Sequence, residues 1–166
     1  MKTKLLGLLV IVAVITGACK KDPEKGLTPP TQSGANTFSC KINGQIFMPK
    51  QELFGPTPLY GQIETSNGYK TLIISASNPS DPFIKNIYIN IFDFKGIGTY
   101  PIVIADGVYV DCYLNVPAPN QEKSRSGTLK ITKYEGKIVS GTFEFNVTHG
   151  TENIAVTLGR FDLTLR

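Results

Sequence analysis

The strongest constraint on the fold is a two-residue alternation of apolar and polar side chains that runs from Thr37 almost to the C-terminus. This period places successive side chains on opposite faces of a β-strand, and no window repeats apolar residues at helical spacing for long enough to predict a helix. Loops rich in Pro, Gly, Asn and Ser separate the alternating segments. The sequence therefore predicts one all-β domain over residues 37–166, an antiparallel β-sandwich or a barrel-like sheet.

The turn residues and the phase of the alternation locate the strands. Asn43-Gly44 and Asn67-Gly68 favour tight hairpin turns, because Asn and Gly tolerate positive φ. In the last segment the alternation shifts after Leu158, so we predict a β-bulge at Gly159-Arg160. The expected strands cover residues 38–42, 45–48, 59–65, 69–77, 86–94, 108–116, 127–134, 138–148 and 154–165.

Two cysteines lie within the predicted domain. Cys112 alternates in phase with apolar neighbours such as Leu114, and Cys40 does so with Phe38 and Ile42, so we expect both thiols in the core. They could form a disulfide if their Cα atoms approach within about 7 Å. Two separate buried thiols are the alternative, and the alternation does not decide between them.

The N-terminal residues form a basic and apolar leader. Lys2 and Lys4 precede 14 apolar and small residues, Leu5–Ala18, a length that suits a signal sequence, since crossing a bilayer core takes about 20. Cys19 follows directly, and this boundary resembles the lipobox of bacterial lipoproteins, with Thr16 where Leu is usual. The resemblance implies that Cys19 is acylated, with a palmitate-type chain, and becomes the mature N-terminus. Ordinary signal-peptide cleavage at the same place is the alternative.

The residues after Cys19 are rich in turn formers. Residues 20–36 contain three prolines, two glycines and few large apolar side chains, so we expect a flexible, disordered tether. The predicted organisation is a signal peptide over 1–18, a lipidated N-terminus and tether over 19–36, and the β domain. Lys20, rather than Asp, fits the Gram-negative sorting pattern for the outer membrane. We therefore expect a lipid anchor in the outer membrane, with the periplasmic or cell-surface face left open.

Several longer motifs lie in the predicted domain: "SGANTFSCKINGQIFMP" over 33–49, "GTYPI" over 98–102 and "ITKYEGKIVSGTFEFNV" over 131–147, followed by "GRFDL". Together they resemble a family of small envelope lipoproteins of Bacteroidetes, whose domain has no assigned chemistry. The likeness spans most of the predicted domain. It implies an envelope lipoprotein with a β-rich domain, and it implies no reaction.

The residue types that support catalysis or metal binding do not cluster in the sequence. His149 is the only histidine, and the chain shows neither clustered Cys and His ligands nor an acidic calcium loop, so we expect no metal, no cofactor and no catalytic residue. The formal net charge is +4 without a basic run, which does not indicate nucleic acid as a partner. The alternative function is an envelope hydrolase acting on glycan or peptide, which would use His149 or a pair of carboxylates from Asp93, Asp106, Asp111 and Glu144.

One set of side chains suggests a binding surface. Tyr109, Asp111 and Tyr113 alternate out of phase with the core residues of their strand, and Tyr88 and Asn90 share one face of the preceding strand. If the two strands pair, these residues form a platform that could hold a glycan or peptide by stacking and hydrogen bonding. Cross-strand pairs that only shield the sheet are the alternative. The leading functional hypothesis is a lipid-anchored, non-catalytic binding or structural module.

Overall fold

The computed structural model describes residues 22–82, 84–103, 110–115 and 121–166, with the side chains of 103, 110–113, 115 and 121–125 left out of the description. Over these residues the chain forms ten strands and no helix. The strands are β1 (Thr37–Ile42), β2 (Gln45–Phe47), β3 (Leu59–Ser66), β4 (Tyr69–Ser77), β5 (Asn86–Ile91), β6 (Gly98–Val103), β7 (Val110–Asn115), β8 (Gln121–Glu135), β9 (Ile138–His149) and β10 (Glu152–Thr164).

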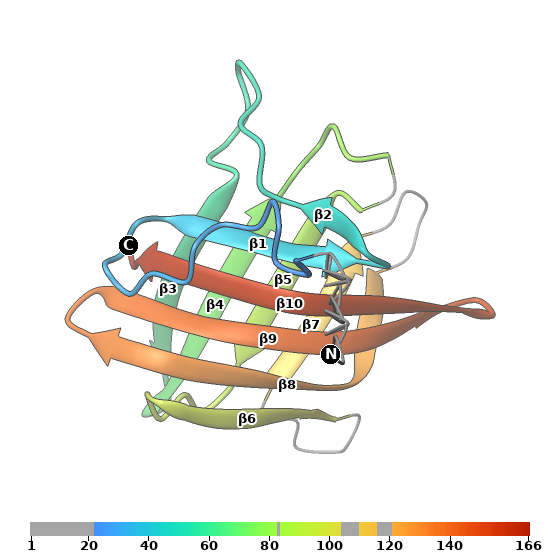
Figure 1. Cartoon of the computed structure of the whole chain (residues 1–166). Helices are drawn as coiled ribbons and strands as arrows, with labels where there is room; N and C mark the ends of the chain where they lie inside the picture. The colour runs from blue at the N-terminus through green and yellow to red at the C-terminus, as the bar shows by residue number, and fades with distance from the viewer. Residues whose placement is uncertain (1–21, 83, 104–109, 116–120) are drawn as a thin grey trace, which may run out of the picture.

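The strands pair in the order β2-β1-β10-β9-β8-β7-β5-β4-β3, and β6 pairs with β8. All of these pairs are antiparallel. Figure 1 shows two layers, a front layer of β1, β2, β6, β9, β10 and most of β8, and a back layer of β3, β4, β5 and β7 whose strands run across it. Strand β8 connects the layers, because its first residues pair with β7 and the rest pair with β9 and β6. The predicted all-β sandwich is confirmed.

The core lies between the two layers and follows the predicted alternation. In β5, Ile87, Ile89 and Ile91 are fully buried, whereas the intervening polar residues are partly exposed. In the front layer, the Phe143 ring lies 5.1 Å from the Phe38 ring, measured between ring centroids. Apolar side chains of both layers therefore face each other, as a sandwich requires.

Both Asn-Gly turns form as predicted. Asn43 and Gly44 have φ values of 47° and 81°, and Asn67 and Gly68 have φ values of 50° and 82°. Two consecutive residues with positive φ are the signature of a type I′ turn, whose twist matches that of the flanking strands. The two turns join β1 to β2 and β3 to β4.

The bulge in β10 is confirmed, but its position was predicted wrongly. Strand β10 places two residues, Thr157 and Leu158, opposite one residue of β9. Leu158 has a positive φ of 53°, so the left-handed residue precedes Gly159-Arg160. Gly159 serves a different purpose, since a Cβ at this position would lie 2.4 Å from the ring of Phe143. The glycine thus makes room for the ring on the neighbouring strand.

The front layer contains more strand than the sequence predicted. Strand β6, which includes the "GTYPI" motif, was not expected as a strand, and β8 begins at Gln121 instead of residue 127. Pro101 lies within β6, and β8 is the partner of β6 among the described strands. Proline has no backbone N–H to donate to a neighbouring strand, so within a sheet it is tolerated mainly in an edge strand such as β6.

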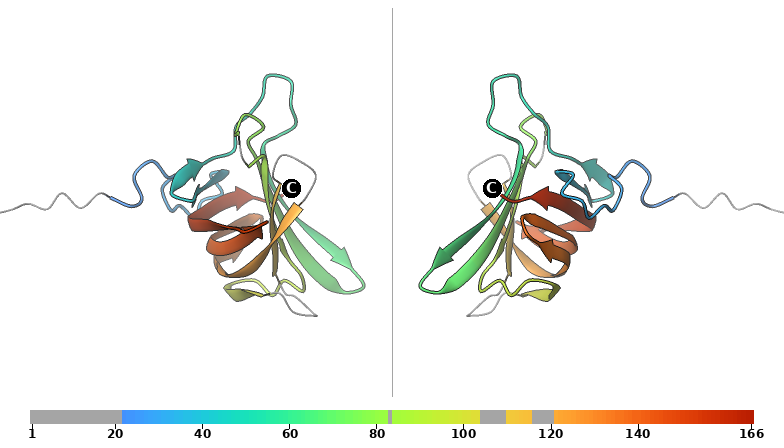
Figure 2. Two further views of the ribbon diagram at one scale, coloured as in Figure 1. Left: turned by 90° about the vertical axis from the view of Figure 1, so that its right-hand side faces the viewer. Right: turned by 90° about the vertical axis from the view of Figure 1, so that its left-hand side faces the viewer.

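The expected tether is ordered where the structure describes it. Residues 22–36, here called the docked segment, cross the outer face of the front layer (Figure 2). They make hydrogen bonds to β1 and β10 and turns within themselves. The prediction of a disordered tether is therefore wrong for these residues, because their polar groups have partners on the sheet even though they offer little apolar surface.

Candidate functional site

The outer face of the front layer carries buried polar side chains. Arg160 and Asp162 flank Phe161, whose ring points into the core, so the two charged side chains point away from it. Their exposed fractions are nevertheless only 8% and 1%. Strand pairing places Arg160 beside Ser39 and Asp162 beside Ser140, and both serines are also buried. The docked segment therefore covers a polar part of the sheet.

Asp162 is the centre of this covered region. Its carboxylate joins the docked segment to both β9 and β10, because it accepts hydrogen bonds from residues far apart in the chain. At distances of 2.7–3.1 Å the donors are the hydroxyls of Thr31 and Ser140 and the backbone amides of Ser33, Gly34 and Ala35. A buried carboxylate with this many donors is fully satisfied, and this compensates for its loss of water.

The hydrogen bonds also set the protonation state of Asp162. Burial by itself raises the pKa of the carboxyl, but hydrogen bonds from Thr31, Ser140, Ala35 and Gly34 lower it by more, so the pKa lies well below its usual range. Each of these donors favours the charged form of the acid. Asp162 is therefore an anion at neutral pH and in mildly acidic solution.

A second group of contacts holds the earlier half of the docked segment. The Arg160 guanidinium donates to the Glu24 carboxylate at 3.1 Å and to the Thr28 carbonyl at 3.3 Å. The Thr28 amide in turn donates to the Ser39 hydroxyl at 3.0 Å. Charge-assisted bonds from a buried guanidinium are stronger than neutral ones. The segment is thus attached at two separate places along its length.

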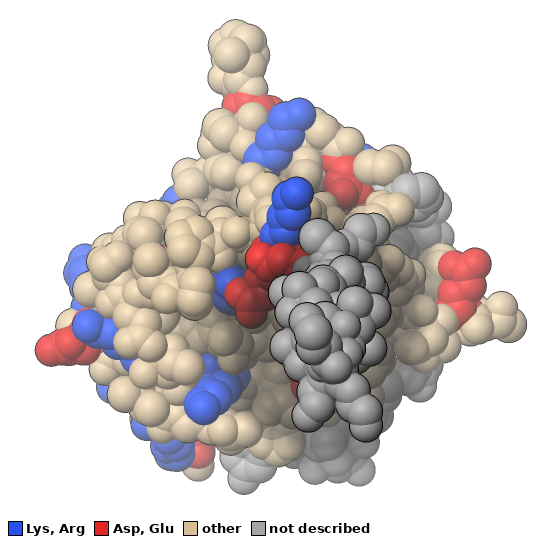
Figure 3. All heavy atoms as spheres, viewed as in Figure 1, with Lys and Arg blue, Asp and Glu red and all other residues tan. Residues whose placement is uncertain are grey.

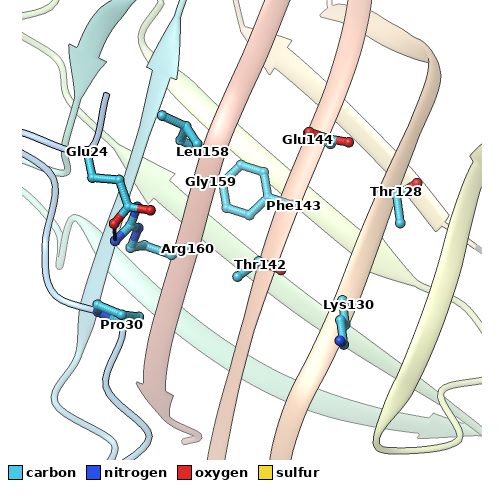
Figure 4. A pocket seen from close by; sticks show the side chains of 10 residues that line it. All are labelled: Glu24, Pro30, Thr128, Lys130, Thr142, Phe143, Glu144, Leu158, Gly159 and Arg160. Atoms are coloured by element: carbon cyan, nitrogen blue, oxygen red, sulfur yellow. Dashed lines mark hydrogen bonds and ion pairs between the residues drawn. The ribbon is translucent and has the colours of Figure 1, made fainter. Parts of the chain in front are cut away.

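Beside the docked segment lies a trough of about 410 Å³, with side chains from β8, β9 and β10 around it (Figure 4). Lys130 and Glu144 supply opposite charges on neighbouring strands, and Phe143 reaches the trough at the bulge of β10. The full lining is Glu24, Pro30, Thr128, Lys130, Thr142, Phe143, Glu144, Leu158, Gly159 and Arg160. This lining suits a polar ligand with hydroxyl or zwitterionic groups, because both charge signs and two threonine hydroxyls are present.

A smaller hollow of about 260 Å³ lies where the β1–β2 and β9–β10 hairpins approach the loop before β5. Its apolar part includes Phe47, Ile84 and Ile154, which are buried, and its carboxylates are Asp81 and Glu152. Asp81 already accepts a hydrogen bond of 2.8 Å from the Ile84 amide. The hollow therefore combines an apolar floor with acidic groups.

The two strands of the predicted platform do pair. Tyr88 lies opposite Tyr113 and Asn90 lies opposite Asp111 in the β5–β7 ladder, while Tyr88 and Asn90 are half-buried on the face away from the core. The side chains of Asp111 and Tyr113 lie outside the described residues, as does the whole of Tyr109. The expected backbone arrangement of the platform is therefore confirmed for the four residues that the ladder includes.

The same register extends the platform toward β3, which the sequence did not predict. Tyr88 pairs with Ser75, and Ser75 pairs with Tyr60. The guanidinium carbon of Arg166 lies 5.3 Å from the centre of the Tyr60 ring. We call the set Tyr60, Ser75, Tyr88 and Tyr113 the tyrosine row, which crosses all four strands of the back layer.

Cys40 is fully buried, which confirms the face assigned to it. It is a free thiol, so the disulfide with Cys112 is not formed, and burial raises the pKa of the Cys40 thiol well above its usual range. A thiol in this environment stays protonated and unreactive. The side chain of Cys112 and all of Cys19 lie outside the described residues.

Among the groups considered for a hydrolase, Glu144 is the one placed in the trough. Asp93 forms a surface ion pair of 2.6 Å with Lys95. His149 ends β9 and lines neither the trough nor the smaller hollow. Asp106 and the side chain of Asp111 lie outside the described residues.

Sequence reasoning missed Arg160 and Asp162. The available signal was their spacing, since two charges flank one phenylalanine in "GRFDL" and must share the outer face of a strand. A hydroxyl-rich stretch at residues 28–33 was the other half of the signal. Nothing in either stretch alone indicates that the two meet.

Comparisons with known proteins found no family model that matches this chain, and no similar curated protein or solved structure. Over the described residues, no helix is both long and apolar enough to cross a membrane. In the same part of the chain, His, Cys, Asp and Glu side chains form no group of three or more that could hold a metal ion.

Proposed function

We propose that this protein is an envelope lipoprotein, anchored in the outer membrane through acylated Cys19, that acts as a non-catalytic binding module related to the small lipoproteins of Bacteroidetes. The observation that carries the binding role is the tyrosine row. It crosses the outer face of the back layer, whereas the docked segment covers the outer face of the front layer. The docked segment, which leads toward Cys19, and the row thus belong to opposite layers of the sandwich.

The row has the chemistry of a carbohydrate or peptide surface. Tyr60 and Tyr88 are half-buried, so their rings are held by the sheet while part of each remains accessible. Gln62 and Asn90 lie two residues further along the same strands and therefore on the same face. Aromatic rings with amide neighbours allow stacking and hydrogen bonding to a hydroxyl-rich or peptide ligand.

The binding role is tested by affinity electrophoresis against a panel of bacterial and plant polysaccharides and by titration with peptidoglycan-derived peptides. The test variant combines Tyr88→Ala with Tyr113→Ala, and Tyr69→Ala is the matched control because Tyr69 is an exposed tyrosine outside the row. We expect the double variant to lose retention while the control keeps it. Equal retention of both variants contradicts the assignment of the row.

The anchor is tested separately by mass spectrometry of the protein from its native host. We expect an N-terminal peptide that begins with Cys19 and carries fatty-acyl mass, together with recovery in the outer-membrane fraction. An N-terminal Cys19 without acyl groups refutes the lipoprotein assignment and leaves the binding test unaffected.

The envelope hydrolase is the second candidate, and the placement of Glu144 in the trough is the observation that favours it. Glycoside hydrolysis needs two carboxylates, and Glu24, whose carboxylate accepts a hydrogen bond from Arg160, also lines the trough. Incubation of wild type and Glu144→Gln with the same polysaccharide panel tests this. Product release by wild type that is absent in the variant supports the hydrolase, and no release from either refutes it.

A further inference from the structure

The loop between β2 and β3 presents two large apolar side chains to solvent. Residues 48–58, here called the protruding loop, extend beyond both layers (Figure 1). Leu53 and Phe54 are 90% and 96% exposed, the highest values among the large apolar residues that the structure describes. Adjacent residues exposed to this degree contribute nothing to the core, so their apolar character needs an explanation other than folding.

The loop is braced so that its tip stays extended. The Gln51 side-chain amide donates to the carbonyls of Glu52, Gly55 and Pro56, at 2.9, 3.0 and 3.4 Å. The Gly55 amide also donates to the Glu52 carbonyl at 3.4 Å, which closes a turn around the two apolar residues. The polar backbone of the tip is thus partly satisfied from within the loop, which is what insertion into an apolar phase requires.

Further exposed apolar residues connect this loop to the start of the docked segment. Ile46 and Met48 are exposed on β2 and just after it. Gly26 lies against Ile46, because a Cβ at Gly26 would be 2.5 Å from the Ile46 Cδ1 atom. Strand β2 therefore lies between the docked segment and the protruding loop, as Figures 1 and 2 also show.

The chain leaves little distance between this edge and a lipid at Cys19. Asp22 is the first described residue and follows Cys19 by three positions, so an extended chain spans at most about 11 Å between them. The docked segment cannot lengthen this link while its contacts to Arg160 and Asp162 are intact. An acylated Cys19 would thus hold the β2 edge close to the bilayer.

We propose that Leu53 and Phe54 insert into the headgroup and acyl boundary of the same leaflet that holds the Cys19 anchor, which gives the protein two points of membrane contact. This inference rests on the lipoprotein assignment above. Glu52, which is exposed next to Leu53, is the charged residue of this turn, and Figure 3 shows uncharged atoms at the outermost end of the loop with an acidic group directly below them. Apolar residues beyond a charged base match the change from acyl chains to headgroups.

A bilayer fits this tip better than a protein partner does. Stable protein interfaces use about 20 to 30 residues on each side, whereas the tip of the loop offers two adjacent side chains. Insertion into lipid needs no matching partner surface, because the acyl region accepts any apolar group of suitable depth. The membrane is therefore the occupant to which we commit.

Fluorescence provides a direct test, because the chain contains no tryptophan. Phe54→Trp places a single reporter at the tip, and Leu53→Trp is a second one. Tyr69→Trp is the control, since Tyr69 is 61% exposed and begins β4 at the hairpin on the side away from the docked segment. The full chain is produced with its leader in a Gram-negative host and reconstituted into phosphatidylethanolamine and phosphatidylglycerol vesicles with brominated acyl chains.

We expect bromine to quench the emission of Phe54→Trp and Leu53→Trp by about half or more, since interfacial apolar groups lie roughly 5–10 Å into the boundary region. Tyr69→Trp should keep its emission. Acylated protein that floats with the vesicles but shows no quenching at either tip position refutes the inference and leaves the lipoprotein assignment standing. A blue shift of the tip emission without quenching by brominated lipid shows that protein covers the tip, and it refutes the inference too. Absence of acyl mass on Cys19 refutes both proposals.

Discussion

The two outer faces of the sandwich differ in what covers them. On the front layer, the docked segment buries the polar side chains of Ser39, Ser140, Arg160 and Asp162. On the back layer, Tyr88 and Asn90 remain half-exposed on the outer face. Among the described residues, the chain itself thus occupies one sheet face through hydrogen bonds, whereas on the other face Tyr88 and Asn90 stay partly accessible and Ser75 is buried. Polar residues on an outer face can therefore serve two different purposes. Where a neighbouring segment supplies their hydrogen-bond partners, they hold that segment in place, and where none does, they remain accessible to a ligand.

The largest effect is expected from Asp162→Ala, which removes the acceptor that all of the donors around it share. A buried hydrogen-bond donor left without an acceptor lowers stability by about 1 to 3 kcal/mol. We therefore expect the free energy of unfolding to fall by about 3 kcal/mol. Urea denaturation measures it. Trypsin should also cleave after Lys25 faster in the variant, because the docked segment is released.

Asp93→Asn is the control for this experiment, because it removes one charge of a surface ion pair with Lys95 and Asn tolerates the positive φ of 51° at this position. Exposed ion pairs contribute little to stability. If the two variants unfold at the same urea concentration, the contacts of Asp162 do not hold the front face together and the contrast between the faces fails.

The next effect concerns pH. The pKa of Asp162 is lower in the folded protein than in the unfolded chain, so its stabilisation is fully present above the unfolded value of about 4. It is lost progressively as the pH falls below that value, at up to about 1.4 kcal/mol per pH unit for one proton. Asp162→Asn removes this titration. The difference in unfolding free energy between wild type and variant should therefore be constant from pH 5 to 7 and shrink below about pH 4. A difference that stays constant to pH 2.5 contradicts this.

The smallest effect on stability is expected on the open face. Tyr88→Ala removes a cross-strand neighbour of Tyr113 and Ser75, which contributes less than about 1 kcal/mol to the free energy of unfolding. Affinity for the ligand should fall about tenfold, which corresponds to ~1.4 kcal/mol of lost stacking. Thermal unfolding and affinity electrophoresis measure the two quantities. A large loss of stability with no loss of affinity shows that the row serves packing alone.

The sandwich could be predicted from the sequence because a strand with one buried face alternates apolar and polar residues. Ile87, Ile89 and Ile91 alternate with polar residues, and all three are buried. The two Asn-Gly turns were predictable for a similarly local reason, since their φ values are properties of the dipeptide itself. Strand β6 left a weaker trace, because Pro101 interrupts a motif too short to show a clear alternation.

The front face could not be predicted in the same way. Residues 22–36 were expected to be disordered because their composition offers little apolar surface, but composition does not register hydrogen bonds between distant segments. Thr31 and Asp162 are separated by 131 positions and bond at 2.7 Å. The β10 bulge shows a related limit, since the phase shift revealed that one residue was extra, but not that Leu158 would take the left-handed conformation.

The docked segment also has a mechanical consequence. A pull between a ligand on the back layer and the anchor would load the contact of Glu24 with Arg160 first, because Glu24 is nearest to the anchor, and the Asp162 contacts afterwards. Release of residues 22–36 would add up to about 50 Å of extended chain before any strand is disturbed. Under tension the segment would therefore detach from the sheet in two steps, and each step would lengthen the chain. Single-molecule pulling would record these steps as successive extensions.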